Sequence, residues 1–345
     1  MGSVVGMEIS ASAVRAVEIK GGHTSRPAVI RAYSVDLPEG VARDGEVLNT
    51  DMFQIALENL WSKGKFASRE VALCVGNRQS VVRQVTLPFL PGKQLKQSLP
   101  FQAAELLPIA TEDLLIDFYP QQLLELDDKA EVEGLLVAVA KRAVEKNIAV
   151  LNSAKLRVLR ADLLPFAVSR LEHVAQARAG RRLQVTINSD TTYISLVSGA
   201  VTEVIRVVAL GTGDVAAAVG EYLGADEEAA LSAMRHIGLS AGEDAHEEEL
   251  SEVMRNEITV ITDAIRSTIE YARSSGDGDA RVDEIVLVGN GRHIAGLGRA
   301  ISEATATPTR FSDAISKLTH GKSLELGNSV TEFAAAAGVA MQGGK

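Results

Sequence analysis

Basic residues are the minority in this 345-residue chain, where 35 Lys and Arg stand against 45 Asp and Glu and give a formal net charge of −10. Such a chain has no overall positive field to gather phosphate polymers, which argues against general nucleic-acid binding. Aromatic residues are also scarce, and 8 Phe, 5 Tyr and 1 Trp leave few platforms on which bases or sugars could stack. The 46% apolar content is ample for the cores of two or three α/β domains.

A single cysteine, Cys74, cannot form an intramolecular disulfide, and it lies in the apolar run 71–75, which is typical of a buried strand. No stretch approaches the roughly 18 consecutive apolar residues that predict a membrane-spanning helix. The first residues carry neither the basic region of a secretory signal nor a myristoylation motif. We therefore expect a cytoplasmic protein with a reduced core thiol.

The motifs of the common catalytic classes are missing. No G-x-x-x-x-G-K-[ST] phosphate loop and no G-x-S-x-G nucleophile turn occurs. The glycine turns 211–213 and 289–291 both lack the third glycine of a dinucleotide fingerprint. The six histidines are scattered, and His246, which opens an acidic run, has no second histidine one helical turn further on. The sequence therefore predicts no metal site and no catalytic residue.

Hydrophobic periodicity indicates alternating strands and helices. The first 75 residues predict the order strand, strand, strand, helix, strand, at 4–9, 14–19, 28–35, 51–63 and 71–75. From residue 80 the pattern changes to a compact α+β unit with strand 81–87, helix 93–107 kinked at Pro100, strands 114–119 and 133–140, helix 142–154 and strand 157–159. Helix 164–177 then leads to a charged junction at 178–182.

The opening pattern returns in the second half of the chain. Residues 5–12 predict a strand that ends in a tight polar turn, and residues 184–195 repeat that plan. The elements that follow are strand 201–210, helices 214–222, 226–237 and 252–273, strand 284–288, the turn 289–291 and an Ala-rich helix 330–341. Because a repeated supersecondary unit is stronger evidence for a fold than a single motif, we expect a duplicated α/β protein.

Two hairpin-led halves with a strand-G-x-G-helix near the end resemble the actin-like ATPase superfamily. The unit between the halves narrows the resemblance, because residues 82–88, 101–108 and 112–118 are similar, in order, to the insert of the PilM family, cytoplasmic type IV pilus assembly proteins related to the division protein FtsA. Segments 265–271 and 333–340 extend the similarity over nearly the whole chain. The resemblance implies an α/β, actin-like fold with ribonuclease-H-like duplicated halves and a strand-helix-strand-strand insert. The implied domains are a first half (1–79, 162–180 and 325–345), the insert (80–161) and a second half (181–324).

The resemblance also implies an ATP site with Mg at the turns of the two halves, although several of its residues differ here. Where relatives place an aspartate that orders hydrated Mg²⁺ and a glycine that admits the phosphates, this chain has Glu8 and Ser10. In the second turn, Asn188 replaces a glycine and Thr186 replaces a metal-side aspartate. The residues that would contact nucleotide are Glu8, Ser10, Ala11, Ser12, Arg15, Asn188, Thr191, Thr192, Gly289, Asn290 and Gly291.

The lost carboxylate impairs hydrolysis more than binding, because it removes electrostatic help from the transition state. We therefore expect no role for ATP turnover. Two alternatives stay open for the turns: weak ATP binding, or hairpins that now only form the fold.

The function that the resemblance implies is a scaffold at the cytoplasmic face of the inner membrane. Its membrane association is indirect, through the short N-terminal cytoplasmic segment of a PilN-like membrane protein that docks between the first half and the insert. Strand 82–87 and helix 93–107 are the expected places for that groove, and Phe101 and Leu106 either line it or pack in the core. The acidic segment 243–252 is either a contact for a pilus motor ATPase or a solvated helix start.

Two other functions compete with the scaffold. An FtsA-like division scaffold is disfavoured because residues 341–345 are not a basic amphipathic membrane tail. A sugar- or acetate-kinase-like phosphotransferase of the same superfamily needs a base near the phosphate turns, for which Glu8 and Asp190 are the candidates.

Overall fold

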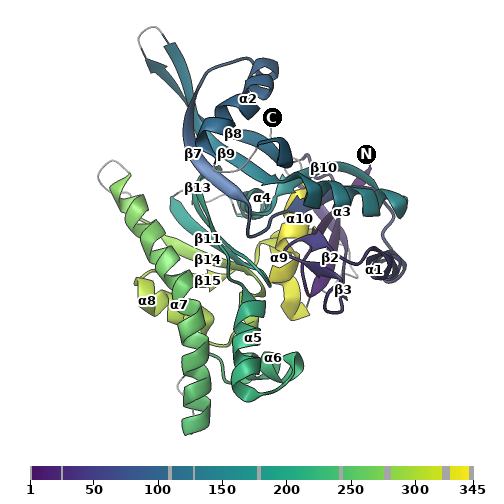
Figure 1. Ribbon diagram of the computed structural model, residues 1–345, viewed down its shortest axis with the longest axis vertical. Coiled ribbons are helices and arrows are strands. Elements are labelled where there is room, and N and C mark those ends of the chain that lie inside the picture. The colour runs from purple at the N-terminus through teal and green to yellow at the C-terminus, as the bar shows by residue number, and fades with distance from the viewer. Residues whose placement is uncertain are drawn as a thin grey trace.

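Two sheets of matching design form the body of the molecule (Figure 1). The computed structural model describes residues 2–24, 26–107, 111–126, 129–176, 180–240, 244–275, 281–320 and 327–341. Among these residues the first sheet runs in the order β10 (Arg157–Leu163), β6 (Glu70–Val75), β1 (Ser3–Ile9), β2 (Ala13–Lys20), β3 (Ala28–Asp36) and β16 (Thr319–His320). The second runs in the order β13 (Val201–Val208), β12 (Thr192–Ser198), β11 (Arg181–Ile187), β14 (Glu284–Gly289) and β15 (Thr309–Phe311).

The two sheets repeat the same strand pairing. In the first sheet β1 pairs antiparallel with β2 and parallel with β6, and in the second β11 pairs antiparallel with β12 and parallel with β14. The predicted internal repeat is therefore confirmed. Because parallel strands point their carboxyl ends to the same edge, this pairing places the hairpin turn and the end of the parallel strand side by side in each half.

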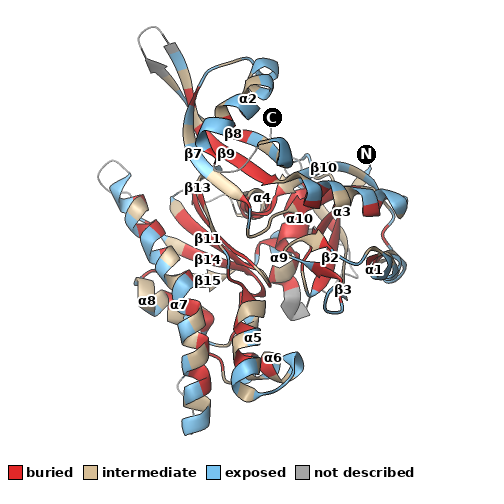
Figure 2. Cartoon of the chain, viewed as in Figure 1, coloured by how far each residue is buried: buried red, intermediate tan, exposed pale blue. Residues whose placement is uncertain are grey.

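Helices cover both faces of the first sheet (Figure 2). One face packs against α1 (Thr50–Gly64) and α3 (Lys141–Ser153), and the other against α4 (Leu164–Ala175) and α10 (Ala334–Ala340). The helix α10 is built from small residues because it lies very close to its neighbours: a Cβ added at Gly338 would stand 1.9 Å from the carbonyl oxygen of Ala167 in α4. Both α4 and α10 contribute residues to the core that the two sheets share.

The second sheet is covered on its outer face by four helices, α5 (Thr212–Leu223), α6 (Glu227–His236), α7 (Ala245–Ser274) and α8 (Leu297–Thr305). Ile258, Ile261, Ile265 and Ile269 hold helical spacing on α7, and all four are buried against the sheet. None of the helices in the described ranges combines the length and the apolarity needed to cross a membrane.

The lone cysteine is a core residue, as predicted. Cys74 is buried in β6, and its thiol donates to the backbone oxygen of Ala335 at 3.2 Å. Burial raises the pKa of this thiol well above its usual value, so it stays protonated and unreactive.

The insert is a three-stranded antiparallel sheet with one helix. Its elements are β7 (Val81–Pro88), α2 (Gly92–Leu106), the 3-10 turn Thr111–Asp113, β8 (Leu114–Leu126) and β9 (Lys129–Ala140), with sheet order β7-β9-β8. Leu87, Leu99, Phe118 and Leu136 form its core. The predicted order of strand, helix, strand and strand is confirmed. The helix continues through Pro100, which lies on its exposed side.

The sequence underestimates the hairpin of β8 and β9, which pairs out to Leu126 and Lys129 rather than ending at 119 and 133. A bulge between Pro120 and Gln122 shifts the register there, so the alternation of apolar and polar residues is interrupted while the pairing continues.

The strand pairing differs from the predicted boundary of the insert at residue 161. The strand predicted over 157–159 pairs in parallel with β6 and belongs to the first sheet. Val150 and Leu151 of α3 pack in the core of that sheet as well. We therefore propose that the insert unit is 80–140.

Two smaller differences concern element ends. The long helix α7 begins at Ala245 rather than at 252, because the side chain of Asp244 accepts from the N–H groups of His246 and Glu247 at 2.9 Å and caps it there. The predicted helix 330–341 is a 3-10 segment (Gly327–Phe333) followed by α10. Residues 178–179, in the predicted charged junction, lie outside the described residues. The remaining short elements are β4 (Ala42–Arg43), β5 (Glu46–Val47) and α9 (Ala314–Lys317).

Candidate functional site

Three turns that are far apart in the sequence line one cleft. They are the turn between β1 and β2, the turn between β11 and β12, and the turn after β14, which continues as the 3-10 helix Asn290–His293. The cleft has a volume of about 910 Å³. Its lining includes four of the predicted nucleotide residues, Ala11, Ser12, Arg15 and Asn290.

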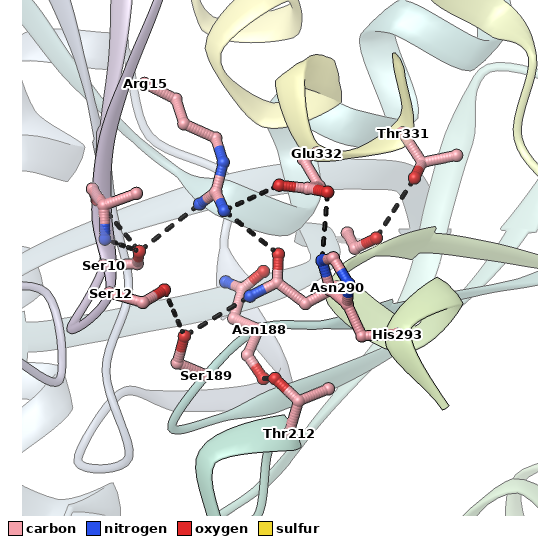
Figure 3. A network of polar contacts seen from close by, with 12 residues as sticks. Ser10, Ser12, Arg15, Asn188, Ser189, Thr212, Asn290, His293, Thr331 and Glu332 are labelled. Atoms are coloured by element: carbon pink, nitrogen blue, oxygen red, sulfur yellow. Dashed lines mark hydrogen bonds and ion pairs between the residues drawn. The ribbon is translucent and has the colours of Figure 1, made fainter. Parts of the chain in front are cut away.

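The turns of the two halves touch each other directly (Figure 3). The hydroxyl oxygens of Ser12, in the first turn, and Ser189, in the second, are 3.0 Å apart and hydrogen-bonded. The amide of Asn290 donates to Ser189 at 3.3 Å, so the third turn joins the same contact. The three turns therefore form one connected polar network.

Arg15 is the centre of this network. Its Nη1 donates to the hydroxyl of Ser10 at 3.3 Å, and its Nη2 donates to Oδ1 of Asn290 at 3.3 Å and to Oε2 of Glu332 at 2.8 Å. His293 Nε2 lies 3.1 Å from the other carboxylate oxygen of Glu332. Burial opposes ionisation of Glu332, but the hydrogen bond from His293 and the charge of Arg15 outweigh it and lower its pKa. Glu332 is therefore an anion that forms an ion pair with the guanidinium of Arg15.

Glu8 lies behind the network, opposite Arg15 in the β1–β2 ladder. Its burial raises the pKa of its carboxyl from 4.5 to about 7, although the charge of Arg15 acts in the other direction. Glu8 lines a cavity of only about 20 Å³ together with Ser10, Asn188 and Thr191. A space of that size holds about one water molecule.

The N-terminus of α5 also faces the second turn, and helix N-termini commonly bind phosphate. Here its backbone donors are already used: the N–H of Thr212 donates to the oxygen of Asn188 at 2.9 Å, and that of Gly213 to the oxygen of Ser189 at 2.8 Å. The N–H of Gly211 donates to the side chain of Asp214 at 2.8 Å. These three donors serve the local fold rather than an anion.

The other predicted residues have structural partners. The hydroxyl of Thr191 donates to Asp44 at 3.2 Å, and that of the fully buried Thr192 donates to the oxygen of Leu210 at 2.8 Å. Gly289 and Gly291 are buried in the third turn, where the oxygen of Gly289 accepts from Thr331 at 3.1 Å. None of these four residues lines the cleft.

The phosphates of Mg·ATP do not fit this arrangement. Hydroxyls that bind one phosphate from opposite sides are separated by it, roughly 5 Å or more, because each hydrogen bond alone takes about 2.8 Å. Ser12 and Ser189 are only 3.0 Å apart. The contacts of the turns therefore conflict with the cofactor that the resemblance implied.

Sequence reasoning missed three members of the network, Ser189, His293 and Glu332. Ser189 could have been found, because it lies in the second turn directly after the predicted residue Asn188. Glu332 could not, because it is 317 positions from Arg15 and only the fold brings the two together.

A second candidate site is a groove of about 550 Å³ between the insert and the first half. It is lined by residues 115–119 of β8, residues 161–163 of β10, two side chains of α2 (Lys96 and Leu99) and two of α4 (Phe166 and Arg170), with Val75, Val137, Val139 and Val144. The rings of Tyr119 and Phe166 stack here with centroids 4.7 Å apart. The groove is therefore a largely apolar trough that also carries the charged side chains Lys96, Asp117, Asp162 and Arg170.

This groove differs in part from the predicted one. Helix α2 contributes to it, but strand 82–87 does not, and β8 and β10 take that place. Phe101 and Leu106 neither line the groove nor lie in the core: their side chains are 79% and 36% exposed. Phe101 faces solvent because α2 buries its opposite side, Leu99 and Ala103, in the insert, whereas Leu106 is the last residue of the helix.

Comparison with known proteins supports both the fold and the family. The family of type IV pilus assembly protein PilM matches residues 6–344. The structure is similar to a PilM–PilN type IV pilus biogenesis complex, with 22% identity over 98% of this chain and 97% of the other and a TM-score of 0.83. It is also similar to the ethanolamine utilization protein EutJ of Carboxydothermus hydrogenoformans, with 12% identity over 99% of this chain and 90% of the other and a TM-score of 0.58. A third similar structure is ADP-bound MreB5 of Spiroplasma citri, with 12% identity over 97% of this chain and 94% of the other and a TM-score of 0.56. No curated protein sequence matches the chain.

Two hairpin-led sheets that share a core and meet at a cleft define an actin-like fold, in agreement with the similarity to MreB5. Within that class, the chain belongs to the family of type IV pilus assembly protein PilM.

Proposed function

We propose that this chain is a scaffold of the type IV pilus assembly platform that binds the N-terminal cytoplasmic segment of a PilN-like membrane protein in the groove between the insert and the first half. The observation that carries the proposal is the groove itself, an apolar trough of about 550 Å³ in a member of the PilM family. A solved relative is described as a complex of PilM with PilN.

The groove has the features that an extended peptide requires. Strand β8 is an edge of the described insert sheet, and β10 is an edge of the described first sheet, and both line the groove. An edge strand can pair with an added strand through its main-chain groups, while pockets for alternate side chains supply specificity. Leu115 and Phe166 offer such apolar contacts, and Lys96 and Asp117 offer polar ones.

This mode of binding places the chain at the cytoplasmic face of the membrane through its partner, without insertion of its own. The scaffold needs no chemistry at the cleft, so we propose no ATPase activity. A contact between a pilus motor ATPase and the acidic start of α7 stays a prediction. Asp244, which lies in that segment, has a structural role as the N-cap of α7.

Titration with a peptide copied from the partner's cytoplasmic N-terminus tests the proposal. Leu115 and Leu123 are both exposed leucines on β8, but only Leu115 lines the groove. We expect Leu115→Asp to weaken peptide binding at least tenfold, because it removes about 1.5–3 kcal/mol of apolar burial and adds a charge. The matched control, Leu123→Asp, retains the affinity of the unmodified chain. Equal affinities in the two variants, or no binding by the unmodified chain, contradict the groove as the peptide site.

A further inference from the structure

The contacts of the cleft connect the two halves of the chain. Ser12 and Arg15 belong to the first half, and Ser189 and Asn290 to the second. Both hydrogen bonds that join these pairs, Ser12–Ser189 and Arg15–Asn290, cross from one half to the other (Figure 3). Glu332 completes the bridge, since it binds Arg15 on one side and His293 on the other.

We propose that this chain has replaced the nucleotide of an actin-like protein with an internal clasp made by Ser12, Ser189, Arg15, Asn290, His293 and Glu332, which joins the halves permanently and excludes Mg·ATP. The inference goes beyond the proposed scaffold function and does not depend on it, because none of the clasp residues lines the peptide groove.

The charge around the cleft supports the clasp over a nucleotide site. Three guanidinium groups line it, those of Arg15, Arg43 and Arg235. The carboxylates that line it are more numerous: Asp36, Glu39, Asp190, Glu227, Glu228 and Glu332. A polyphosphate entering the cleft therefore meets an excess of negative charge, and long-range electrostatics oppose its binding.

The guanidinium of Arg15 is also not available to a ligand. Arg15 and Glu332 form their ion pair with side chains that are only 6% and 11% exposed. A phosphate that took over Arg15 would leave the Glu332 carboxylate buried without its main counter-charge, which is a costly state. His293 alone would remain beside it at 3.1 Å.

The clasp holds the two halves together through side chains of the protein itself. Six side chains from both halves supply the cross-cleft contacts, and the donors of α5 that could bind phosphate are used by the second turn. The relation between the halves is therefore fixed by folding and does not respond to nucleotide.

The first test is thermal unfolding of the unmodified chain in 5 mM Mg·ATP, with Mg²⁺ alone as the control. A ligand with a Kd of 1 mM would stabilise the native state about sixfold at this concentration and raise the Tm by roughly 2 °C. We expect no rise. A rise of that size, or a Kd below 1 mM by calorimetric titration, overturns the proposal.

The second test is a cross-link across the cleft. In the double variant Ser12→Cys/Ser189→Cys, two sulfurs replace hydroxyls that stand 3.0 Å apart, and the native Cys74 is buried and does not compete. We expect mild oxidation to form the intramolecular disulfide in most of the protein, at equal rates with and without Mg·ATP. The single variants are the controls. Failure to cross-link, or protection by Mg·ATP, overturns the clasp.

The third test compares the loss of the buried ion pair with the loss of an exposed carboxylate. Glu332→Gln removes the carboxylate that Arg15 binds, whereas Glu303→Gln changes an exposed glutamate on α8. We expect the Tm to fall by roughly 5–10 °C in the first variant and by less than 1 °C in the second. Equal Tm values contradict the clasp. If Glu332→Gln fails to fold, the first two tests still decide, because they use a chain with an intact ion pair.

Discussion

Glu8 makes the stability of the fold depend on pH in an unusual direction, and Glu8→Gln isolates that effect. Glu8 is 4% exposed in the first hairpin, and its burial raises the carboxyl pKa from 4.5 to about 7. In the unfolded chain the same carboxyl is free and titrates near 4.5. Between these two pH values the native protein holds a proton that the unfolded chain has released.

The sign and size of the effect follow from that proton. Because Glu8 binds more protons in the native state in this window, its contribution to the free energy of unfolding falls as the pH rises from about 4.5 to about 7 and is constant above that range. Since each tenfold change in proton affinity is worth about 1.4 kcal/mol, the fall attributable to Glu8 is on the order of 3 kcal/mol. The glutamine variant has no such proton and lacks this fall.

Urea unfolding of both proteins at a series of pH values measures the effect as a difference. We expect the stability of Glu8→Gln relative to the unmodified chain to increase by about 2–3 kcal/mol between pH 4.5 and 8. Glu332 does not obscure the comparison, because its pKa is lowered and its contribution is lost only as the pH falls below 4.5. Glu58→Gln, on the exposed side of α1, is the matched control and stays parallel to the unmodified chain. Parallel curves for Glu8→Gln as well would refute the burial argument.

Two further predictions concern the backbone. Gly289→Ala should lower the free energy of unfolding by at least about 2 kcal/mol, because Gly289 has φ +81° and an added Cβ would stand 2.5 Å from the oxygen of Ile187. Gly298→Ala, in α8, is the control. It should be neutral or stabilising by up to about 1 kcal/mol, because its added Cβ meets Phe311 at an ordinary 3.5 Å. Urea unfolding measures both variants, and equal losses of stability would contradict the prediction. Asp244→Ala should cost about 1 kcal/mol by removing the cap of α7, and hydrogen exchange of the N–H groups of His246 and Glu247 should rise with it; unchanged exchange would exclude the capping role.

The fold could be predicted from the sequence where the signal is local or repeated. Alternation and turn residues suffice for the hairpins of both halves, and the long helix is evident from the isoleucines of α7 at helical spacing. The partner of a strand is not a local property. The strand at 157–163 is recognisable from its residues, but only the three-dimensional position of β6 decides that it joins the first sheet.

The candidate site could be predicted only in outline, for a similar reason. The turns of the two halves carry recognisable residues, and the duplication brings them together. What the turns do depends on contacts between distant positions, such as Arg15 with Glu332 and Ser12 with Ser189. From the sequence, Ser12 is compatible with binding a phosphate, whereas its position 3.0 Å from Ser189 favours a closed turn.

The most direct test of the central claim is a calorimetric titration of the unmodified chain with the partner's N-terminal peptide, repeated in 5 mM Mg·ATP. A scaffold with a clasped cleft binds the peptide with the same Kd in both titrations, because no nucleotide enters to change the relation of the halves. A Kd that differs severalfold between the two titrations would contradict the clasp. Absence of peptide binding in both would contradict the scaffold function and leave the clasp untouched.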